Sequence, residues 1–205
     1  MALRYIKISV LMLLTALGFC FQSQSYKSYN CSELNISFKL PIDFSFAEDK
    51  IVNDLEKKGN QAEKEAFPNA RTRTWQPTCL KTLITPKKEV FSILTILKDV
   101  LVQDHKSYEN FLDYYFQEQK YFLGSRLKSK GLVIEKMEEK NENVKLAGKD
   151  ARKIKLTFTV KGSKIIYLTY LLLKNKYAFQ LTYVGKNTDF TKLVEVGIES
   201  STFLK

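Results

Sequence analysis

The stretch that decides the fold reads IKLTFTV at residues 154–160, IIYLTYLLL at 165–173 and YAFQLTY at 177–183. The first segment alternates apolar residues with Lys and Thr, a pattern typical of a strand with one buried face. The second segment is apolar on both faces, so it needs cover on both sides and should lie in the interior of a sheet. Short polar links at 161–163 and 175–176 predict tight turns, and the three segments therefore predict an antiparallel meander.

Shorter β-rich runs surround this meander. Alternation at residues 36–40 predicts a strand that Pro41 ends, and residues 44–46 predict a second short strand. The runs at 79–85 and 90–97 flank Pro86-Lys87-Lys88 and predict a hairpin. Residues 132–137 predict a further strand before the meander, whereas residues 26–33 are interpreted as a polar entry segment.

Three helices are predicted. Apolar residues recur at spacings of three and four from Tyr108 to Leu123, which predicts an amphipathic helix capped by Ser107 that ends near Gly124. A short helix is expected at the start of the charged stretch 48–65. A closing helix is expected after residue 188, with Thr188 or Asp189 as its cap.

These elements predict one α+β domain over residues 26–205, a twisted antiparallel sheet with helices packed on it. Four segments carry a resemblance to a known superfamily: ISFKLP at 36–41, AGKDA at 147–151, YAFQLTY at 177–183 and SSTF at 200–203. Through these segments the chain resembles the PsbP/DcrB-like superfamily over most of its length. The resemblance implies a PsbP-like α/β/α sandwich, a scaffold used mainly to dock onto larger assemblies.

The N-terminus predicts export. Arg4 and Lys7 precede an apolar run from Ile8 to Phe21, which is shorter than the roughly 20 residues of a membrane-spanning helix. This pattern is typical of a signal peptide at 1–25, with cleavage before Phe21 or before Tyr26. We therefore expect a secreted or periplasmic protein without a membrane-spanning segment after cleavage. Cys20 leaves an alternative open, a lipid anchor on that cysteine.

The net charge favours anionic partners. The chain carries a formal net charge of +11 at pH 7, and residues 1–25 contain only two of its basic residues. A basic surface favours an acidic protein or an anionic surface, although a solvated lysine-rich surface explains the same charge. No nucleic-acid motif is present, so the expected partner is an envelope or extracellular protein.

Catalytic groups are scarce in the sequence. Its one histidine, His105, has no nucleophile signature near it, and no cluster of ligands predicts a metal site. Glu135, Glu138 and Glu139 are interpreted as solvated charges rather than as paired catalytic carboxylates. We therefore predict neither an enzyme nor a cofactor.

Two sets of residues are candidates for a site or a crosslink. Arg71, Arg73 and Trp75 alternate in an extended stretch, and Arg and Trp are enriched at binding hot spots. Cys31 and Cys79 remain after cleavage, and export favours a disulfide between them, although two separate buried thiols are the alternative.

Three functional hypotheses follow. The first is a non-enzymatic binding or accessory domain of the cell envelope or exterior. The second is a carrier of a small apolar or anionic ligand between sheet and helix, suggested by the aromatic strand at 177–183. The third is a carboxylate-based hydrolase, which the sequence supports least.

Overall fold

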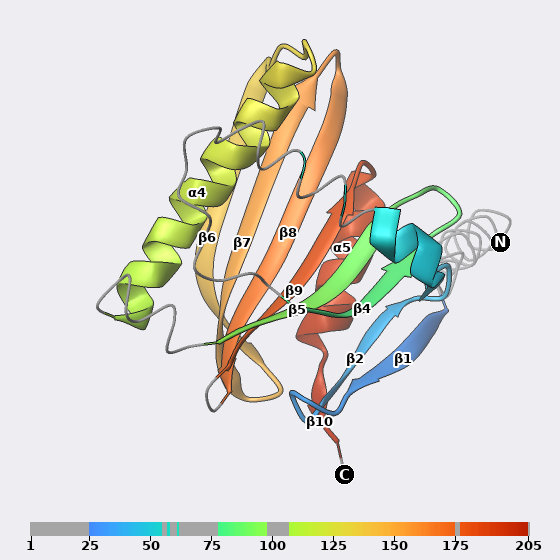
Figure 1. Ribbon diagram of the computed structural model, residues 1–205. Coiled ribbons are helices and arrows are strands. Elements are labelled where there is room, and N and C mark those ends of the chain that lie inside the picture. The colour runs from blue at the N-terminus through green and yellow to red at the C-terminus, as the bar shows by residue number, and fades with distance from the viewer. Residues whose placement is uncertain are drawn as a thin grey trace, which may run out of the picture.

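The described part of the chain forms two antiparallel sheets with two longer helices (Figure 1). The computed structural model describes residues 25–54, 57, 61, 78–97, 107–174 and 177–204. The larger sheet has the strand order β3-β4-β5-β9-β8-β7-β6, and the smaller sheet has the order β1-β2-β10. The elements are β1 Tyr26–Cys31, β2 Ile36–Pro41, β3 Ser45–Phe46, β4 Thr78–Ile84, β5 Val90–Leu97, α4 Tyr108–Ser129, β6 Lys136–Leu146, β7 Lys149–Val160, β8 Ser163–Lys174, β9 Tyr177–Gly185, α5 Thr188–Glu199 and β10 Thr202–Phe203.

The large sheet is covered on both faces. Along β8, Tyr167 and Leu171 belong to a core that α4 covers with Phe111 and other apolar residues. Leu168 and Tyr170, which lie between them on the strand, belong to a second core, which the small sheet and α5 cover. Since successive side chains of a strand point to opposite faces, α4 lies on one face and α5 with the small sheet on the other. This arrangement confirms the predicted α+β class.

The predicted meander is confirmed as β7, β8 and β9. β8 lies between its two neighbours inside the sheet, where its two apolar faces are both buried. The turn at Lys161-Gly162 has φ values of 49° and 71°, as a two-residue hairpin turn of type I′ requires. The second predicted turn, at residues 175–176, lies outside the described residues.

Two strands differ from the prediction. Residues 26–31 form β1, which pairs with β2, and burial of Tyr29 and Cys31 in the core gives this polar segment one inward face. The predicted strand at 132–137 is instead β6 at 136–146, an edge strand paired with β7 over its whole length. Most residues of β6 are exposed, and charged residues are common on edge strands, where they discourage further pairing.

The helix ends differ as well. α4 begins after the predicted Ser107 cap, whose side chain accepts a hydrogen bond from the Asn110 amide, but it continues past Gly124 to Ser129. The cap of α5 is Asn187 rather than Thr188 or Asp189. Its side-chain oxygen accepts from the amides of Asp189 and Phe190 at 2.9 and 3.0 Å.

Candidate functional site

Several predicted features lie outside the described residues. Arg71, Arg73 and Trp75 belong to this group, as do His105 and the signal peptide with Cys20. These features therefore stay predictions. No helix in the described part of the chain combines the length and the hydropathy that a membrane crossing requires.

The two candidate cysteines are free thiols in the structure. Cys31 is buried and its Sγ lies 3.5 Å from a carboxylate oxygen of Glu33, while Cys79 Sγ lies 3.3 Å from the Thr82 hydroxyl. The predicted disulfide is therefore absent from the structure. Formation of the Cys31–Cys79 bridge after export stays a prediction.

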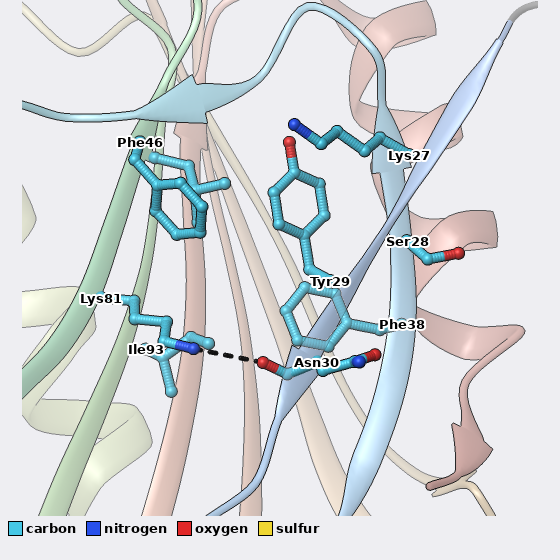
Figure 2. Close-up of a pocket in the computed structure, with 9 residues that line it drawn as sticks. Lys27, Ser28, Tyr29, Asn30, Phe38, Phe46, Lys81 and Ile93 are labelled. Carbon is cyan, nitrogen blue, oxygen red and sulfur yellow. Dashed lines mark hydrogen bonds between the residues drawn. The ribbon is translucent and has the colours of Figure 1, made fainter.

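A cavity of about 250 Å³ lies between the two sheets, beside β1 (Figure 2). It separates β1 from β3 and β4, and side chains from β2 and β5 complete it. The cavity is lined by Lys27, Ser28, Tyr29, Asn30, Phe38, Phe46, Lys81, Leu83 and Ile93.

Aromatic rings form one wall of this cavity. The Tyr29 ring stacks on Phe38 at 6.2 Å and meets Phe46 edge-on at 6.0 Å. The Tyr29 hydroxyl donates a 2.7 Å hydrogen bond to the Phe44 carbonyl, and burial raises the pKa of this tyrosine. Phe46 is 60% exposed although it is apolar, so this ring is available to a partner.

Two lysines flank the rings. Lys27 Nζ lies 5.7 Å from the centre of the Tyr29 ring, and Lys81 Nζ donates to the Asn30 carbonyl at 3.2 Å. Asn30 lies three positions after Lys27 on β1, so the backbone positions beside the two lysines are roughly 10 Å apart along the strand. None of the described residues that line the cavity is a carboxylate. The arrangement is suited to an apolar group that carries negative charge beside it.

The aromatic strand suggested as a ligand wall has another role. In β9, residues 178–183 are all buried, and the apolar residues among them pack into the two cores. Phe179, Leu181 and Tyr183 belong to one core and Ala178 belongs to the other, and none of them lines the cavity, so the ligand position expected between sheet and helix stays a prediction.

A buried charge cluster joins β7 to α5. Lys153 Nζ lies 2.6 Å from Glu199 and 2.8 Å from Glu195, and Lys155 Nζ lies 2.6 Å from Glu195. The Tyr170 hydroxyl donates to Glu199 at 2.8 Å. Burial alone would lower the pKa of Lys153, but hydrogen bonds and charge from the two carboxylates outweigh it and raise that pKa. These groups neutralise one another, so the cluster fastens the helix to the sheet.

The glutamates considered as catalytic carboxylates are separate and exposed. Glu138 pairs with Lys136 at 2.6 Å and Glu139 with Lys120 at 2.7 Å. Glu135 accepts weakly from the Gly162 amide at 3.3 Å. Among the described residues, no group of three His, Cys, Asp or Glu side chains is placed to hold a metal ion.

Sequence reasoning missed the cavity. Its lysines and rings come from four strands, and the segment that supplies Lys27 and Tyr29 has the composition of a polar entry segment. The sequence contains only a weak indication of strand β1, which is the alternation of Tyr29 and Cys31 with polar neighbours.

Comparison with known proteins gives similarities of fold. No protein-family model matches the chain, and no curated protein matches it. Cyanobacterial PsbP (CyanoP) from Synechocystis sp. PCC 6803 is similar at a TM-score of 0.46 and 8% identity, over 90% of this chain and 95% of that chain. LpqN of Mycobacterium tuberculosis is described as involved in cell envelope biogenesis. It gives a TM-score of 0.39 and 10% identity, over 87% of this chain and 90% of that chain. The protein PA94 of Pseudomonas aeruginosa gives a TM-score of 0.34 and 10% identity, over 85% of this chain and 94% of that chain.

Proposed function

We propose that the protein is an exported, non-enzymatic binding domain of the cell envelope or exterior that holds a partner protein at the cavity beside β1. The signal peptide predicted at 1–25 supports the location. The observation that supports the binding role is the cavity itself, where Lys27 and Lys81 flank aromatic rings and the lining found in the described part of the chain contains no carboxylate. An acidic, partly apolar surface of the partner would match it.

The volume of the cavity favours a protein partner over a carried ligand. Small-molecule pockets commonly measure about 300–1,000 Å³. A cavity of about 250 Å³ is small for a whole ligand, but it suits one inserted side chain. The exposed ring of Phe46 then becomes part of the contact, as aromatic residues commonly do at the centres of interfaces.

Site-specific photo-crosslinking in the native host tests this proposal. A benzophenone amino acid replaces Phe46 in one strain, and it replaces Phe203 in a control strain. Both rings are exposed, at 60% and 53%, but Phe203 lies on β10 and does not line the cavity.

We expect a discrete protein adduct from position 46 that position 203 does not give, and we expect Lys81→Glu to abolish it. Equal adducts at both positions, or an adduct that survives Lys81→Glu, would contradict the proposal. Native mass spectrometry of the protein recovered from its host should show the bare chain. A small bound mass that is lost on denaturation would support the ligand-carrier alternative instead.

A further inference from the structure

The cavity lies along the unpaired edge of a strand. β1 is the end strand of the order β1-β2-β10 among the described residues. Four consecutive residues of this strand, 27–30, line the cavity. Since both alternating faces of β1 contribute, the cavity runs beside the strand rather than only beneath it.

The register of β1 decides which backbone groups face the cavity. The Ile42 amide donates to the Ser25 carbonyl at 2.9 Å, so this pair is hydrogen-bonded. Hydrogen-bonded and non-hydrogen-bonded pairs alternate along an antiparallel ladder. The pairs Ser28↔Lys39 and Asn30↔Ser37 are therefore non-hydrogen-bonded pairs. Their amide and carbonyl groups on β1 turn away from β2, toward the open edge.

The contact made by Lys81 agrees with this register. Its ammonium donates to the Asn30 carbonyl at 3.2 Å (Figure 2). An amide N–H of a neighbouring strand would occupy the same position. The lysine satisfies one edge carbonyl while the site is free, and Ser28 and Asn30 themselves are exposed. Lysine is a common residue for shielding an open strand edge.

We infer that β1 accepts an extended segment of the partner as an added strand. This inference rests on the proposed function and specifies its binding mode. One apolar side chain of the segment enters the cavity against Tyr29 and Phe46. Acidic side chains two residues before and after it pair with Lys27 and Lys81, because residues i and i+2 of a strand lie on one face. Main-chain hydrogen bonds provide affinity in such complexes, and the side-chain cavity provides selectivity.

A short synthetic strand tests this mode on the mature exported chain. The probe is the acetylated and amidated heptapeptide Thr-Glu-Thr-Phe-Thr-Glu-Thr, and binding is measured by titration calorimetry. Two further versions carry N-methyl groups on alternate amides, one set for each edge of the strand. Methylation of the edge that faces β1 removes at least two hydrogen bonds, so we expect that version to bind at least about thirtyfold more weakly. We expect the version methylated on the outer edge to bind like the parent peptide.

Protein variants and hydrogen exchange provide independent readouts. Lys81→Glu should weaken binding by about tenfold or more, whereas Lys87→Glu, at the exposed β4–β5 turn, should change it less than about twofold. The amides of Ser28 and Asn30 should gain protection from exchange on binding, which does not depend on any variant folding.

The outcomes separate this inference from the proposed function. Equal binding of the two methylated versions, or unchanged exchange at Ser28 and Asn30, would overturn strand addition. If the peptide does not bind but Phe46 still gives a specific crosslink, the proposed function stands and the inferred mode falls. If both measurements are negative, both fall.

Discussion

The Nζ atom of Lys153 on β7 lies 2.6 Å from Oε1 of Glu199 on α5, and the lysine side chain is only 8% exposed. The same ammonium lies 2.8 Å from Glu195 and 5.8 Å from the centre of the Tyr170 ring. A charge this deeply buried is stable only when it is paired. Lys153 therefore fixes the position of α5 on the sheet.

Lys153→Met should destabilise the protein by about 2 kcal/mol, because it removes the ammonium shared by Glu195 and Glu199, although Glu195 keeps Lys155 as a partner and Glu199 is partly exposed. Urea unfolding at pH 7 measures this change. Lys145→Met is the matched control, since Lys145 pairs with Asp150 on the surface with side chains that are 65% and 91% exposed. The control should change stability by less than about 0.5 kcal/mol. Equal effects of the two variants would mean that the buried cluster does not fasten the helix.

Stability should fall in acid through Glu195. Burial raises the pKa of this carboxyl, but hydrogen bonds and charge from Lys153 and Lys155 outweigh burial and hold the pKa below its ordinary value of 4.5. The unfolded chain then binds the proton more tightly than the folded chain does. The contribution of ionised Glu195 to the free energy of unfolding is present above about pH 4.5. It is lost as the pH falls through the lower pKa of the folded state.

Urea unfolding of the parent protein and of Glu195→Gln, at several values between about pH 6 and pH 3, measures this effect. The variant should start from a lower stability and lose less of it across the range. Parallel curves for the two proteins would show that Glu195 does not contribute to the acid sensitivity.

The strong hydrophobic periods of the sequence predicted the central part of the fold. The alternation at 154–160 predicts β7, and the doubly apolar run at 165–173 predicts β8. A strand buried on one face alternates apolar and polar residues, whereas a strand buried on both faces is apolar throughout. β1 and β6 were harder to predict, because edge strands are exposed and their polar residues resemble those of loops.

The candidate site could not be predicted for a related reason. Lys27 and Lys81 are brought together by the approach of two sheets, and no local pattern encodes that approach. The same holds for Lys153, which looks like the solvated residue of an alternating strand until α5 places two glutamates over it. In both places tertiary packing, and not local sequence, determines which groups surround the lysines.

The two cysteines should differ in reactivity. Cys31 is 1% exposed, and burial is the main cause that raises the pKa of its thiol, whereas Cys79 is half-buried. In the folded, reduced protein at pH 8, iodoacetamide should alkylate Cys31 at least about tenfold more slowly than Cys79. Peptide mass spectrometry measures both rates, and equal rates in urea provide the control.

The same samples decide the predicted disulfide. Protein isolated without reductant and then denatured should show two titratable thiols if the free state seen in the structure persists. An absence of thiols, restored by reductant, would establish that the Cys31–Cys79 bridge forms after export.

Two glycines within helices should respond to Ala in opposite directions. A methyl group at Gly197 of α5 would overlap the carbonyl oxygen of Lys39 on β2 and would lie 3.2 Å from the Tyr26 ring. At Gly124 of α4 the nearest atom would be a methyl of Ile134 at 3.9 Å, an ordinary contact. Gly197→Ala should therefore destabilise the protein by about 2 kcal/mol, because the helix must move off the small sheet. Gly124→Ala should stabilise it by about 0.5–1 kcal/mol through helix propensity. Urea unfolding of both variants measures these changes. A neutral Gly197→Ala would mean that α5 does not pack on β2 as closely as the structure has it, and the position of the small sheet beside the cavity would then need revision.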